Sequence, residues 1–293
     1  MRLLITGAKG NFPSALAPQM LDLGHELVLL DIEPMELPGA RCVQGDIRDA
    51  GAVQWAMTGC DAVIHAFAFH GNMSGSRNED DFYQANVTGT HNILMAMKRL
   101  GITRLVFSSS EVVYGAGMHG RRVMDETTPL IPEGTYPLTK VLGEEMCRFY
   151  ARTADLRIAM LRYGCFVPAD WRVQGMGRLH NWLDRDDVAQ SNVCALNALE
   201  DGAFGCQPFL IHCEKPFVDA DWPQLERDPR PVIERHWPGA LSRLDHAGLA
   251  VPTIHTRYDI SRAKQVLGYR PRHNFGEFLD QLVEDSAESM AKS

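Results

Sequence analysis

The chain has 293 residues, of which 45% are hydrophobic and 23% charged, a composition typical of a folded globular protein and not of a disordered one. Its net charge of −8 and the lack of any run of Lys and Arg argue against nucleic acid as a partner. An acidic chain is also repelled by anionic membrane surfaces, so we expect neither nucleic acid nor a membrane among its partners.

Short β-rich runs alternate with longer amphipathic segments through the first half of the chain. The pattern predicts helices at 12–24, 79–101 and 136–153, and strands at 2–6, 26–31, 40–46, 61–68, 103–110 and 156–163. Strands that alternate with helices indicate parallel βαβ units, so we expect an α/β fold with a doubly wound parallel sheet over residues 1–164. Ligands of such sheets bind at the carboxyl ends of the strands.

The second half, residues 165–293, is less regular and rich in Pro, Trp and Arg. Helical spacing is clear only at 184–199, 259–268 and 275–291. No Gly/Ser linker separates the two halves. We therefore expect a small C-terminal lobe that lies over the sheet edge and binds substrate, with 184–199 packing back on the core.

The cysteines and the N-terminus bear on the compartment. The seven cysteines are odd in number and form no CxxC pair, which favours reduced thiols over a disulfide framework. The apolar run from Leu3 to Ile5 is too short for a signal peptide, and no stretch is long enough to span a membrane. We expect a cytoplasmic protein, and no metal ion in its site.

The first strand runs into a loop with two glycines, "ITGAKGNFP", which opens the first helix. Gly7 and Gly10 let the backbone turn tightly and approach a pyrophosphate. The helix start at Asn11 and Phe12 offers free N–H groups and the positive end of the helix dipole. The placement predicts a dinucleotide site, with a turn that binds no ligand as the alternative.

Two carboxylates follow the next strands. Asp31 ends the second strand, and a carboxylate there suits the free ribose hydroxyls of NAD and repels the 2′-phosphate of NADP. Asp46, in "GDIRD" after the third strand, is placed to accept a hydrogen bond from the adenine amine or to cap the helix that begins near Asp49.

A series of blocks along nearly the whole chain resembles the extended short-chain dehydrogenase/reductase family, the NAD-dependent epimerase/dehydratase group. The blocks occur in the family's order: "TGAKGNFP", "GDIRD", "VIHAFA", "NVTGTHNIL", "FSSSEVVYG", "YPLTK", "LRYGCFVP", "DRDDVA" and "DISRAKQVLGYRP". The resemblance implies a Rossmann-type NAD-binding core and a C-terminal substrate lobe. It also implies cofactor contacts, beyond those of the loop and the two carboxylates, from Ile32, Ile47, Ala66, Phe67, Ala68, Asn86, Ser108, Tyr136, Lys140 and Tyr163.

The resemblance assigns a catalytic set of Ser110, Tyr136 and Lys140. Lys140 lies one helical turn after Tyr136, on the same face. Its cation, together with the cationic nicotinamide, would lower the high pKa of a phenol and favour the phenolate as a base. Lys140 would also hold the nicotinamide ribose, and Ser110 would orient the reacting oxygen. Without this context, the Tyr–Lys pair is an ordinary pair on a helix face and Ser110 a capping hydroxyl.

Two departures from the family pattern stand out. Pro13 replaces the third glycine of the loop. Proline is tolerated in the first turn of a helix, so the cofactor prediction stands. The segment between Pro168 and "DRDDVA" is also short, which leaves little room for a nucleotide-sugar and resembles uronate dehydrogenases and related free-sugar dehydrogenases. In those enzymes a basic residue meets the substrate carboxylate, which implies Arg178 or, second, Arg172; the alternative is a surface arginine.

The remaining substrate candidates lie in loops that should face the pocket. Ser74, Ser76 and His70 follow the fourth strand. The alternative for His70 is a solvent-exposed loop residue with no role in binding. Glu111 follows Ser110 and either reaches substrate or is a solvated turn residue. Two more residues are expected elsewhere: His65 as a satisfied core histidine, and Lys9 pointing to solvent or touching a phosphate.

These features favour an NAD-dependent oxidoreductase that acts on a hydroxyl or carbonyl of a sugar or sugar acid. The alternatives are an NAD-retaining sugar or nucleotide-sugar epimerase and a non-catalytic NAD(P)-sensing protein. The presence of both Tyr136 and Lys140 argues against the last. By analogy with the family, helices 79–101 and 136–153 would form a homodimer interface.

Overall fold

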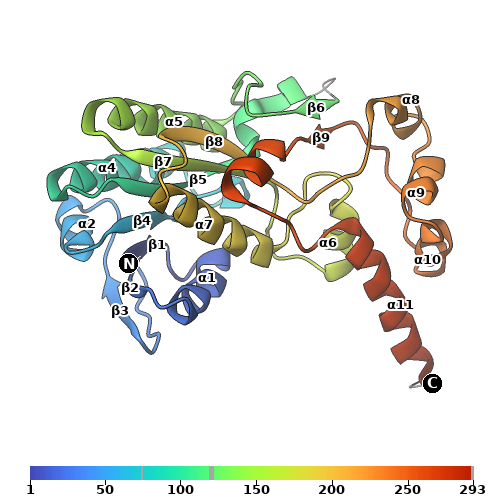
Figure 1. Cartoon of the computed structure of the whole chain (residues 1–293), viewed down its shortest axis with the longest axis horizontal. Coiled ribbons are helices and arrows are strands. Elements are labelled where there is room, and N and C mark those ends of the chain that lie inside the picture. The colour runs from blue at the N-terminus through green and yellow to red at the C-terminus, as the bar shows by residue number, and fades with distance from the viewer. Residues whose placement is uncertain (74, 119–121, 292–293) are drawn as a thin grey trace.

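A seven-stranded parallel sheet forms the centre of the computed structural model, which describes residues 1–73, 75–118 and 122–291. The strands follow the order β3-β2-β1-β4-β5-β7-β8 (Figure 1). Their bounds are β1 Arg2–Thr6, β2 Glu26–Asp31, β3 Ala40–Gln44, β4 Ala62–His65, β5 Arg104–Ser110, β7 Arg157–Tyr163 and β8 Cys206–Ile211. The chain proceeds outward in one direction from β1 and in the other from β4, so the switch point of the doubly wound sheet lies between these two strands.

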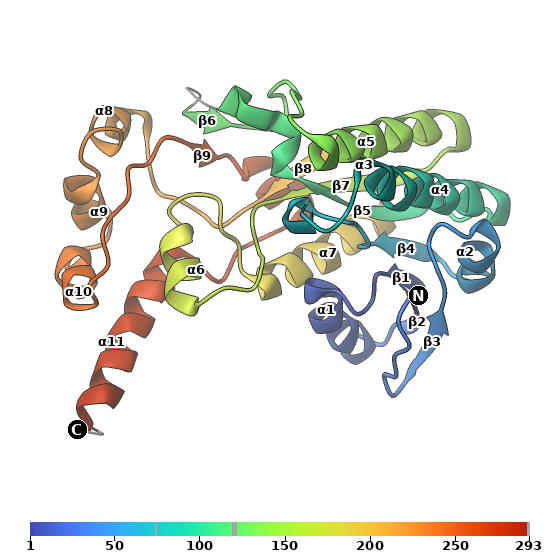
Figure 2. The same ribbon diagram turned by 180° about the vertical axis from the view of Figure 1, so that it is seen from behind.

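Helices cover both faces of the sheet, as both views show (Figures 1 and 2). One face carries α1 (Asn11–Asp22) and α7 (Arg185–Glu200), and the other carries α2 (Ala50–Met57), α4 (Gly89–Leu100) and α5 (Thr135–Ala154). Because both faces are covered, the middle parts of the central strands are continuous buried apolar runs rather than alternating ones. The predicted α/β fold with a doubly wound parallel sheet is confirmed.

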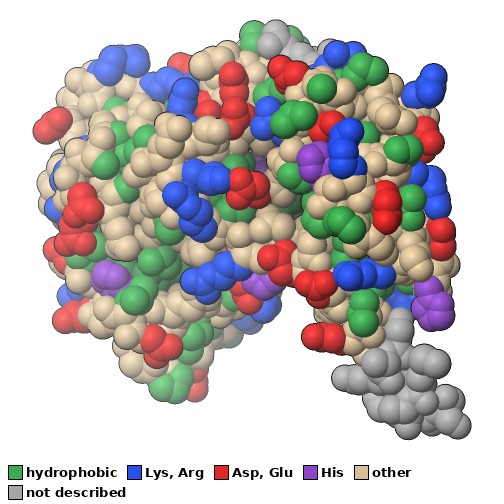
Figure 3. Space-filling model, turned by 45° about the vertical axis from the view of Figure 1, so that its right-hand side comes forward, with side chains coloured by type: hydrophobic (Ala, Val, Ile, Leu, Met, Phe, Trp, Pro, Cys, Tyr) green, Lys and Arg blue, Asp and Glu red, His purple; other side chains and the backbone are tan. Residues whose placement is uncertain are grey.

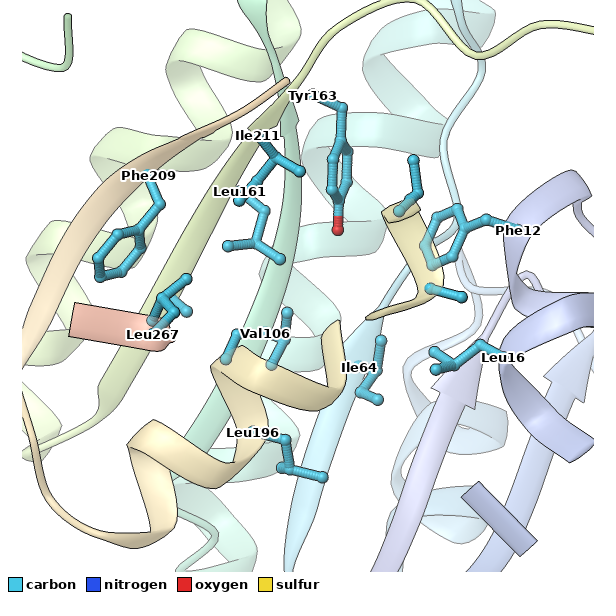
Figure 4. Packing of buried hydrophobic residues seen from close by; sticks show 14 of the residues in the cluster. Phe12, Leu16, Ile64, Val106, Leu161, Tyr163, Leu196, Phe209, Ile211 and Leu267 are labelled. Atoms are coloured by element: carbon cyan, nitrogen blue, oxygen red, sulfur yellow. The ribbon is translucent and has the colours of Figure 1, made fainter. Parts of the chain in front are cut away.

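The core under α1 and α7 reaches the carboxyl ends of the strands. In Figure 4, Phe12 from the start of α1 faces Tyr163 from the end of β7. Their ring centroids lie 5.8 Å apart, and both side chains are buried. The packing of these two rings ties the first helix to the far half of the sheet, next to the site described below.

The C-terminal lobe lies to one side of the sheet and has its own hydrophobic cluster, which includes Trp222, Phe275 and Phe278. Its helices are α6 Trp171–Gly177, α8 Trp222–Leu225, α9 Arg230–His236, α10 Ala240–His246 and α11 Phe275–Ala291. A two-stranded parallel sheet of β6 (Val123–Met124) and β9 (Arg257–Tyr258) joins this lobe to the loop after β5. The division at residue 164 remains a prediction.

Two segments differ from the sequence-based expectation. The helix expected at 79–101 is α3 (Glu79–Phe82), then a π-helical turn η2 (Tyr83–Thr88), then α4. The segment expected as a helix at 259–268 is π-helical at η5 (Ala263–Leu267). Short π segments inside helices are a known mark of functional sites, and η2 lies beside the candidate site. The other short turns are η1 Gly71–Met73, η3 Glu111–Met118 and η4 Asp219–Asp221.

On the face shown in Figure 3, Lys and Arg side chains are interspersed with Asp and Glu. All seven cysteines are free thiols. Within the described ranges, no helix combines the length and apolar character needed to cross a bilayer, and no His, Cys, Asp and Glu side chains gather as a metal-binding group.

Candidate active site

An elongated hollow lies at the carboxyl ends of the strands. Its larger part, about 730 Å³, is bounded by the loops after β1, β4, β5 and β7 and by the start of α5. A smaller recess of about 160 Å³ continues over the ends of β2 and β3. Gly7, Asp31 and Phe67 line both parts, so the two form one continuous site. Its position at the switch point is where α/β sheets bind ligands.

The glycine loop forms a cradle that side chains would fill. Gly7 has φ of +65°, and a Cβ there would come within 2.8 Å of the Phe67 backbone. A Cβ on Gly10 would lie 2.9 Å from the Gly7 carbonyl oxygen. Asn11, the first residue of α1, donates its amide to the Phe166 carbonyl at 2.8 Å, which fixes the helix start. The N–H groups at this helix start suit a pyrophosphate, so the loop fits a dinucleotide.

Asp31 lies where a ribose would be expected. Its carboxylate accepts hydrogen bonds from the backbone N–H groups of Lys9 and Glu33, both at 3.0 Å. The Lys9 ammonium pairs with the Glu33 carboxylate at 2.6 Å, and both residues line the hollow. Lys9 is therefore engaged by a carboxylate rather than left free for a phosphate. Two acidic side chains at this end disfavour an additional phosphate on the ribose.

The smaller recess is lined by Ile32, Asp46, Ile47 and Arg48, and Ile32 is exposed. Arg48 forms an ion pair with Asp46, and its Nε lies 2.9 Å from a carboxylate oxygen of Asp46. The side-chain hydrogen bond from Arg48 lowers the pKa of Asp46. Asp46 was also a candidate to cap helix α2. The structure gives this role to Asp49, whose side chain accepts hydrogen bonds from the backbone N–H groups of Gly51 and Ala52. Asp46 thus keeps its place in the recess.

The segment after β4 forms a further wall. Ala66, Phe67 and Ala68 line the hollow. Asn86, from the π turn η2, is buried behind this wall and lines neither part. Its amide bonds Phe69 through both the N–H, at 2.8 Å, and the carbonyl, at 2.9 Å. Asn86 therefore holds the wall in place instead of facing the hollow.

Ser110, Tyr136 and Lys140 all line the larger part of the hollow. Ser110 ends β5, and the other two lie in the first turns of α5. Tyr136 and Ser110 are hydrogen-bonded through their side chains. The Lys140 ammonium donates to the Ser108 carbonyl at 2.7 Å and lies 5.9 Å from the Tyr136 ring centroid. The structure thus brings together the three residues predicted to be catalytic.

Burial is the main influence on the protonation of Tyr136 and Lys140. Burial raises the pKa of Tyr136 to about 12, opposed by the Ser110 hydrogen bond and reinforced by the charge of Glu111. Burial likewise lowers the pKa of Lys140 to about 7. The protein groups alone therefore keep the phenol protonated. The predicted lowering of the Tyr136 pKa by Lys140 together with the cationic nicotinamide stays a prediction, since desolvation is the largest influence among the protein groups.

A buried ion pair supports the end of β5 from behind. The Ser109 hydroxyl donates to Glu144 at 2.7 Å, and Glu144 binds Arg162 through two bonds of 2.8 and 2.7 Å. Both charged side chains are at most 1% exposed. Arg148 adds a third contact to Glu144, at 2.8 Å. Since Ser109 precedes Ser110, this pair fixes the strand end that carries the Ser110 hydroxyl.

Two further predicted cofactor residues also line the hollow. Ser108 contributes its carbonyl to Lys140, as described above, and Tyr163 lies at the end of the neighbouring strand β7. The Tyr163 hydroxyl accepts a hydrogen bond from Asn192 at 2.9 Å. Burial raises the pKa of Tyr163, so this phenol stays neutral.

The predicted carboxylate-binding arginines lie elsewhere. Arg178 is not among the lining residues; it is 9% exposed and contacts the Asn274 carbonyl and, at 3.5 Å, Asp184. Arg172 forms a surface ion pair with Asp285 at 2.7 Å. Neither guanidinium is available to a substrate in this arrangement.

The loop after β4 contributes one histidine to the hollow. His70 lines it, and burial lowers its pKa. Ser76 is exposed and bonds the Met73 carbonyl instead. Ser74 lies outside the described residues. His65 is a satisfied core histidine, as predicted: Thr6 and Thr90 bond its two ring nitrogens, and burial lowers its pKa to about 3.

The part of the hollow around Glu111 includes residues that the sequence did not predict. Glu111, which was predicted, lines the hollow beside Asn181 and Cys165, which were not. Behind Glu111 lie His212, at the end of β8, and Tyr258, on β9. No motif links these residues, because they come from four separate segments. The only available signal was their expected position at the ends of strands, and β8 had not been recognised.

Comparison with known proteins gives a consistent picture. Residues 3–170 match the NAD dependent epimerase/dehydratase family. The chain is 29% identical to a uronate dehydrogenase of Pseudomonas putida over 192 residues, 64% of this chain and 69% of that protein. It is 30% identical to a UDP-glucose 4-epimerase of Erwinia amylovora over 225 residues, 70% of this chain and 65% of that protein.

Among solved structures, the fold is similar to that of a short-chain dehydrogenase/reductase superfamily protein from Agrobacterium tumefaciens with bound NAD. The TM-score is 0.72 at 21% identity, with 100% of this chain and 99% of the other covered. At this identity the likeness concerns the fold. It agrees with the Rossmann-type arrangement of the sheet and the glycine loop.

Proposed function

Because this chain belongs to the NAD dependent epimerase/dehydratase family, we propose that it is an NAD-dependent dehydrogenase that oxidises a hydroxyl of a sugar-like small molecule. The observation that carries the proposal is the meeting of Ser110, Tyr136 and Lys140 in one wall of a hollow that begins at a glycine cradle. The curated relatives that the chain resembles, uronate dehydrogenases and UDP-glucose 4-epimerases, are named for sugar substrates.

The residues that would hold NAD are those of the cradle, Asp31 and the recess over β2 and β3. When bound, NAD supplies the acceptor for the hydride and places a positive charge near the phenol. Ser110 would orient the reacting hydroxyl, and Tyr136 would take its proton as the carbon gives up the hydride. Lys140 would hold the nicotinamide ribose and stabilise the phenolate, since a phenol with a pKa of about 12 needs nearby cations to serve as a base.

A substrate panel tests this function. Aldoses, uronates and polyols are offered with NAD, and NADH formation is followed by absorbance while the products are identified. Stoichiometric NADH and oxidised product, with NAD preferred over NADP because of Asp31 and Glu33, would support the proposal. Isomerised sugar without net NADH would instead identify an epimerase that retains its cofactor. The absence of both products would contradict an enzymatic role on sugars.

We also propose a homodimer formed by α4 and α5, which lie side by side on the outer face of the sheet (Figures 1 and 2). Tyr83 of η2, which directly precedes α4, is 38% exposed, and Leu138 and Phe149 of α5 are 36% and 51% exposed. Exposed aromatic and aliphatic groups on neighbouring helices favour a self-complementary contact between two copies.

Replacing Phe149 by Glu should convert the dimer to a monomer, because a charge would be buried against the partner copy. Light scattering coupled to size-exclusion chromatography measures the mass. The matched control is Trp55→Glu, which introduces the same charge at a 61% exposed aromatic on α2, away from α5. A wild-type protein that is monomeric, or a Phe149→Glu protein that stays dimeric, would contradict the proposed interface.

A further inference from the structure

Asn181 lies in the segment after α6 and lines the larger part of the hollow beside Glu111. One N–H of its side-chain amide donates to Glu111 Oε1 at 2.5 Å. The carbonyl oxygen of the same amide, Oδ1, accepts no hydrogen bond from the residues that the structure describes. Asn181 is half-buried, and its Oδ1 is not a buried atom. Asn181 therefore brings an accessible hydrogen-bond acceptor to the wall of the hollow.

Glu111 fixes the direction in which this amide faces. Glu111 is 3% exposed, and its carboxylate also bonds the Tyr258 side chain. Its Oε2 lies toward His212, whose Nε2 is 3.4 Å away behind the wall. Burial raises the pKa of Glu111 to about 7, and the bonds from Tyr258 and Asn181 oppose this change because they favour the carboxylate. A carboxylate only accepts hydrogen bonds, so the amide presents its N–H to Glu111 and turns its carbonyl oxygen away.

The backbone of Asn181 is held as well as its side chain. Its carbonyl accepts from the Cys165 N–H at 2.8 Å, and Cys165 pairs with Trp182 in a short parallel bridge. Gly164 permits this approach, because a Cβ there would come within 2.3 Å of the Asn181 carbonyl oxygen and 2.7 Å of the His212 ring. An acceptor held from two sides has little freedom left to lose when a ligand binds, so it is preorganised for recognition.

We propose that Asn181 selects polyhydroxylated substrates by accepting a hydrogen bond from a second hydroxyl, distinct from the one that Ser110 and Tyr136 engage, and that Glu111 positions it. This inference rests on the proposed function and deepens it by naming a specificity-determining residue and the group that it recognises. Sugars and polyols carry hydroxyls on successive carbons, so they can supply both donors. A fixed acceptor penalises an analogue that lacks the second donor, because the acceptor then has no partner in the complex.

The test replaces each hydroxyl of a sugar by fluorine, which is small and cannot donate a hydrogen bond. Glucose, galactose, their uronates and the single-fluorine analogues of each at carbons two, three and four are titrated into the enzyme with NADH, where no oxidation occurs. Calorimetry at about pH 8.5, above the pKa of Glu111, gives the affinities. In the wild type, we expect fluorine at the carbon that faces Asn181 to weaken binding about five- to tenfold.

Asn181→Leu keeps the size of the side chain and removes the acceptor. It should reduce the penalty at that one carbon to less than about twofold, while the penalties at the other carbons stay as in the wild type. A merely structural role for Asn181 would instead weaken the binding of the sugar and of all its analogues alike. The matched control is Asn197→Leu, the same change at an exposed position of α7 outside the hollow, which should keep the wild-type pattern.

Glu111→Ala tests the positioning role. Without its anchor, the Asn181 amide is free to turn its N–H toward the ligand, so the same single penalty should become smaller although Asn181 is intact. If the penalty keeps its full size in Glu111→Ala, Glu111 does not position Asn181. Asn181→Ala replaces the leucine variant in these titrations if that protein does not fold.

The inference and the proposed function can fail separately. The penalties are measured by binding, so the expected pattern supports the inference even if no NADH forms in the activity assay. Oxidation of a sugar by an enzyme whose penalties are unchanged in Asn181→Leu would overturn the inference and leave the function standing. A wild-type protein that binds none of these sugars, or shows no penalty at any carbon, would also overturn the inference, whether or not the variants fold.

Discussion

Replacing Tyr136 by Phe is expected to lower kcat for substrate oxidation by roughly a thousandfold. The change removes the phenol oxygen that is proposed to take the substrate proton beside Ser110, and leaves the ring in place. Cofactor binding should be nearly unchanged, because the cradle at Gly7 and Gly10 lies at the other end of the hollow. Steady-state kinetics and a direct titration with NADH measure the two effects separately.

The matched control is Tyr150→Phe, which removes a hydroxyl from the same helix. Tyr150 contacts Met95 and does not line the hollow, so the control should retain wild-type kcat. In the wild type, the oxidation rate should rise with pH, since the phenolate is the base and the protein raises the pKa of Tyr136. Retention of more than about a tenth of the wild-type kcat in Tyr136→Phe would contradict proton transfer by this residue.

Replacing Glu144 by Gln should destabilise the fold by about 3–5 kcal/mol, because it leaves the Arg162 guanidinium buried without its counter-charge. Arg162 is 1% exposed and cannot turn to water. Its remaining contacts, the Tyr114 hydroxyl at 2.8 Å and the Glu126 carbonyl at 3.3 Å, carry no charge. Urea unfolding of wild type and variant gives the difference in the free energy of unfolding.

Removing both charges provides the control. The double variant Glu144→Leu, Arg162→Met should be much closer to wild type than Glu144→Gln, since no unpaired charge remains. Burial raises the pKa of Glu144, but bonds and charge from Arg162 and the Ser109 bond outweigh it and lower the pKa overall. The pair's stabilisation is therefore present above the ordinary pKa of a glutamate, 4.5, and is lost as pH falls through the lowered pKa of Glu144 in the folded protein. A Glu144→Gln protein as stable as wild type would refute this role.

The sheet could be predicted well where strands are buried on both faces. β1 and β2 were predicted with their observed bounds, because a continuous apolar run ends at Thr6 and at Asp31. β8 was missed because Pro208 interrupts the run Cys206–Ile211. An edge strand has only one neighbour and tolerates a proline. The sequence pattern therefore did not indicate a strand at a position where the edge of the sheet accommodates one.

The meeting of Ser110, Tyr136 and Lys140 was predictable because two of them lie four residues apart in one helix and the third ends a strand. Glu111 was a prediction with two open alternatives, and the structure places it in the wall rather than in solvent. Arg178 was assigned from its place in a segment that resembles uronate dehydrogenases, and it follows the helix end at Gly177 and pairs with Asp184. Side-chain direction at an irregular loop is set by distant partners, which sequence spacing does not reveal.

The edge strand β8 also limits where the chain can be divided. β8 covers β7 from Ile158 to Tyr163, and its end supplies His212 behind the substrate wall. A shortened chain that stopped after β7 would leave six residues of apolar backbone with open hydrogen-bonding groups, a template on which other copies could assemble into aggregates. The second half of the chain thus covers the strand edge at which the first half would otherwise aggregate, and it also adds residues to the pocket.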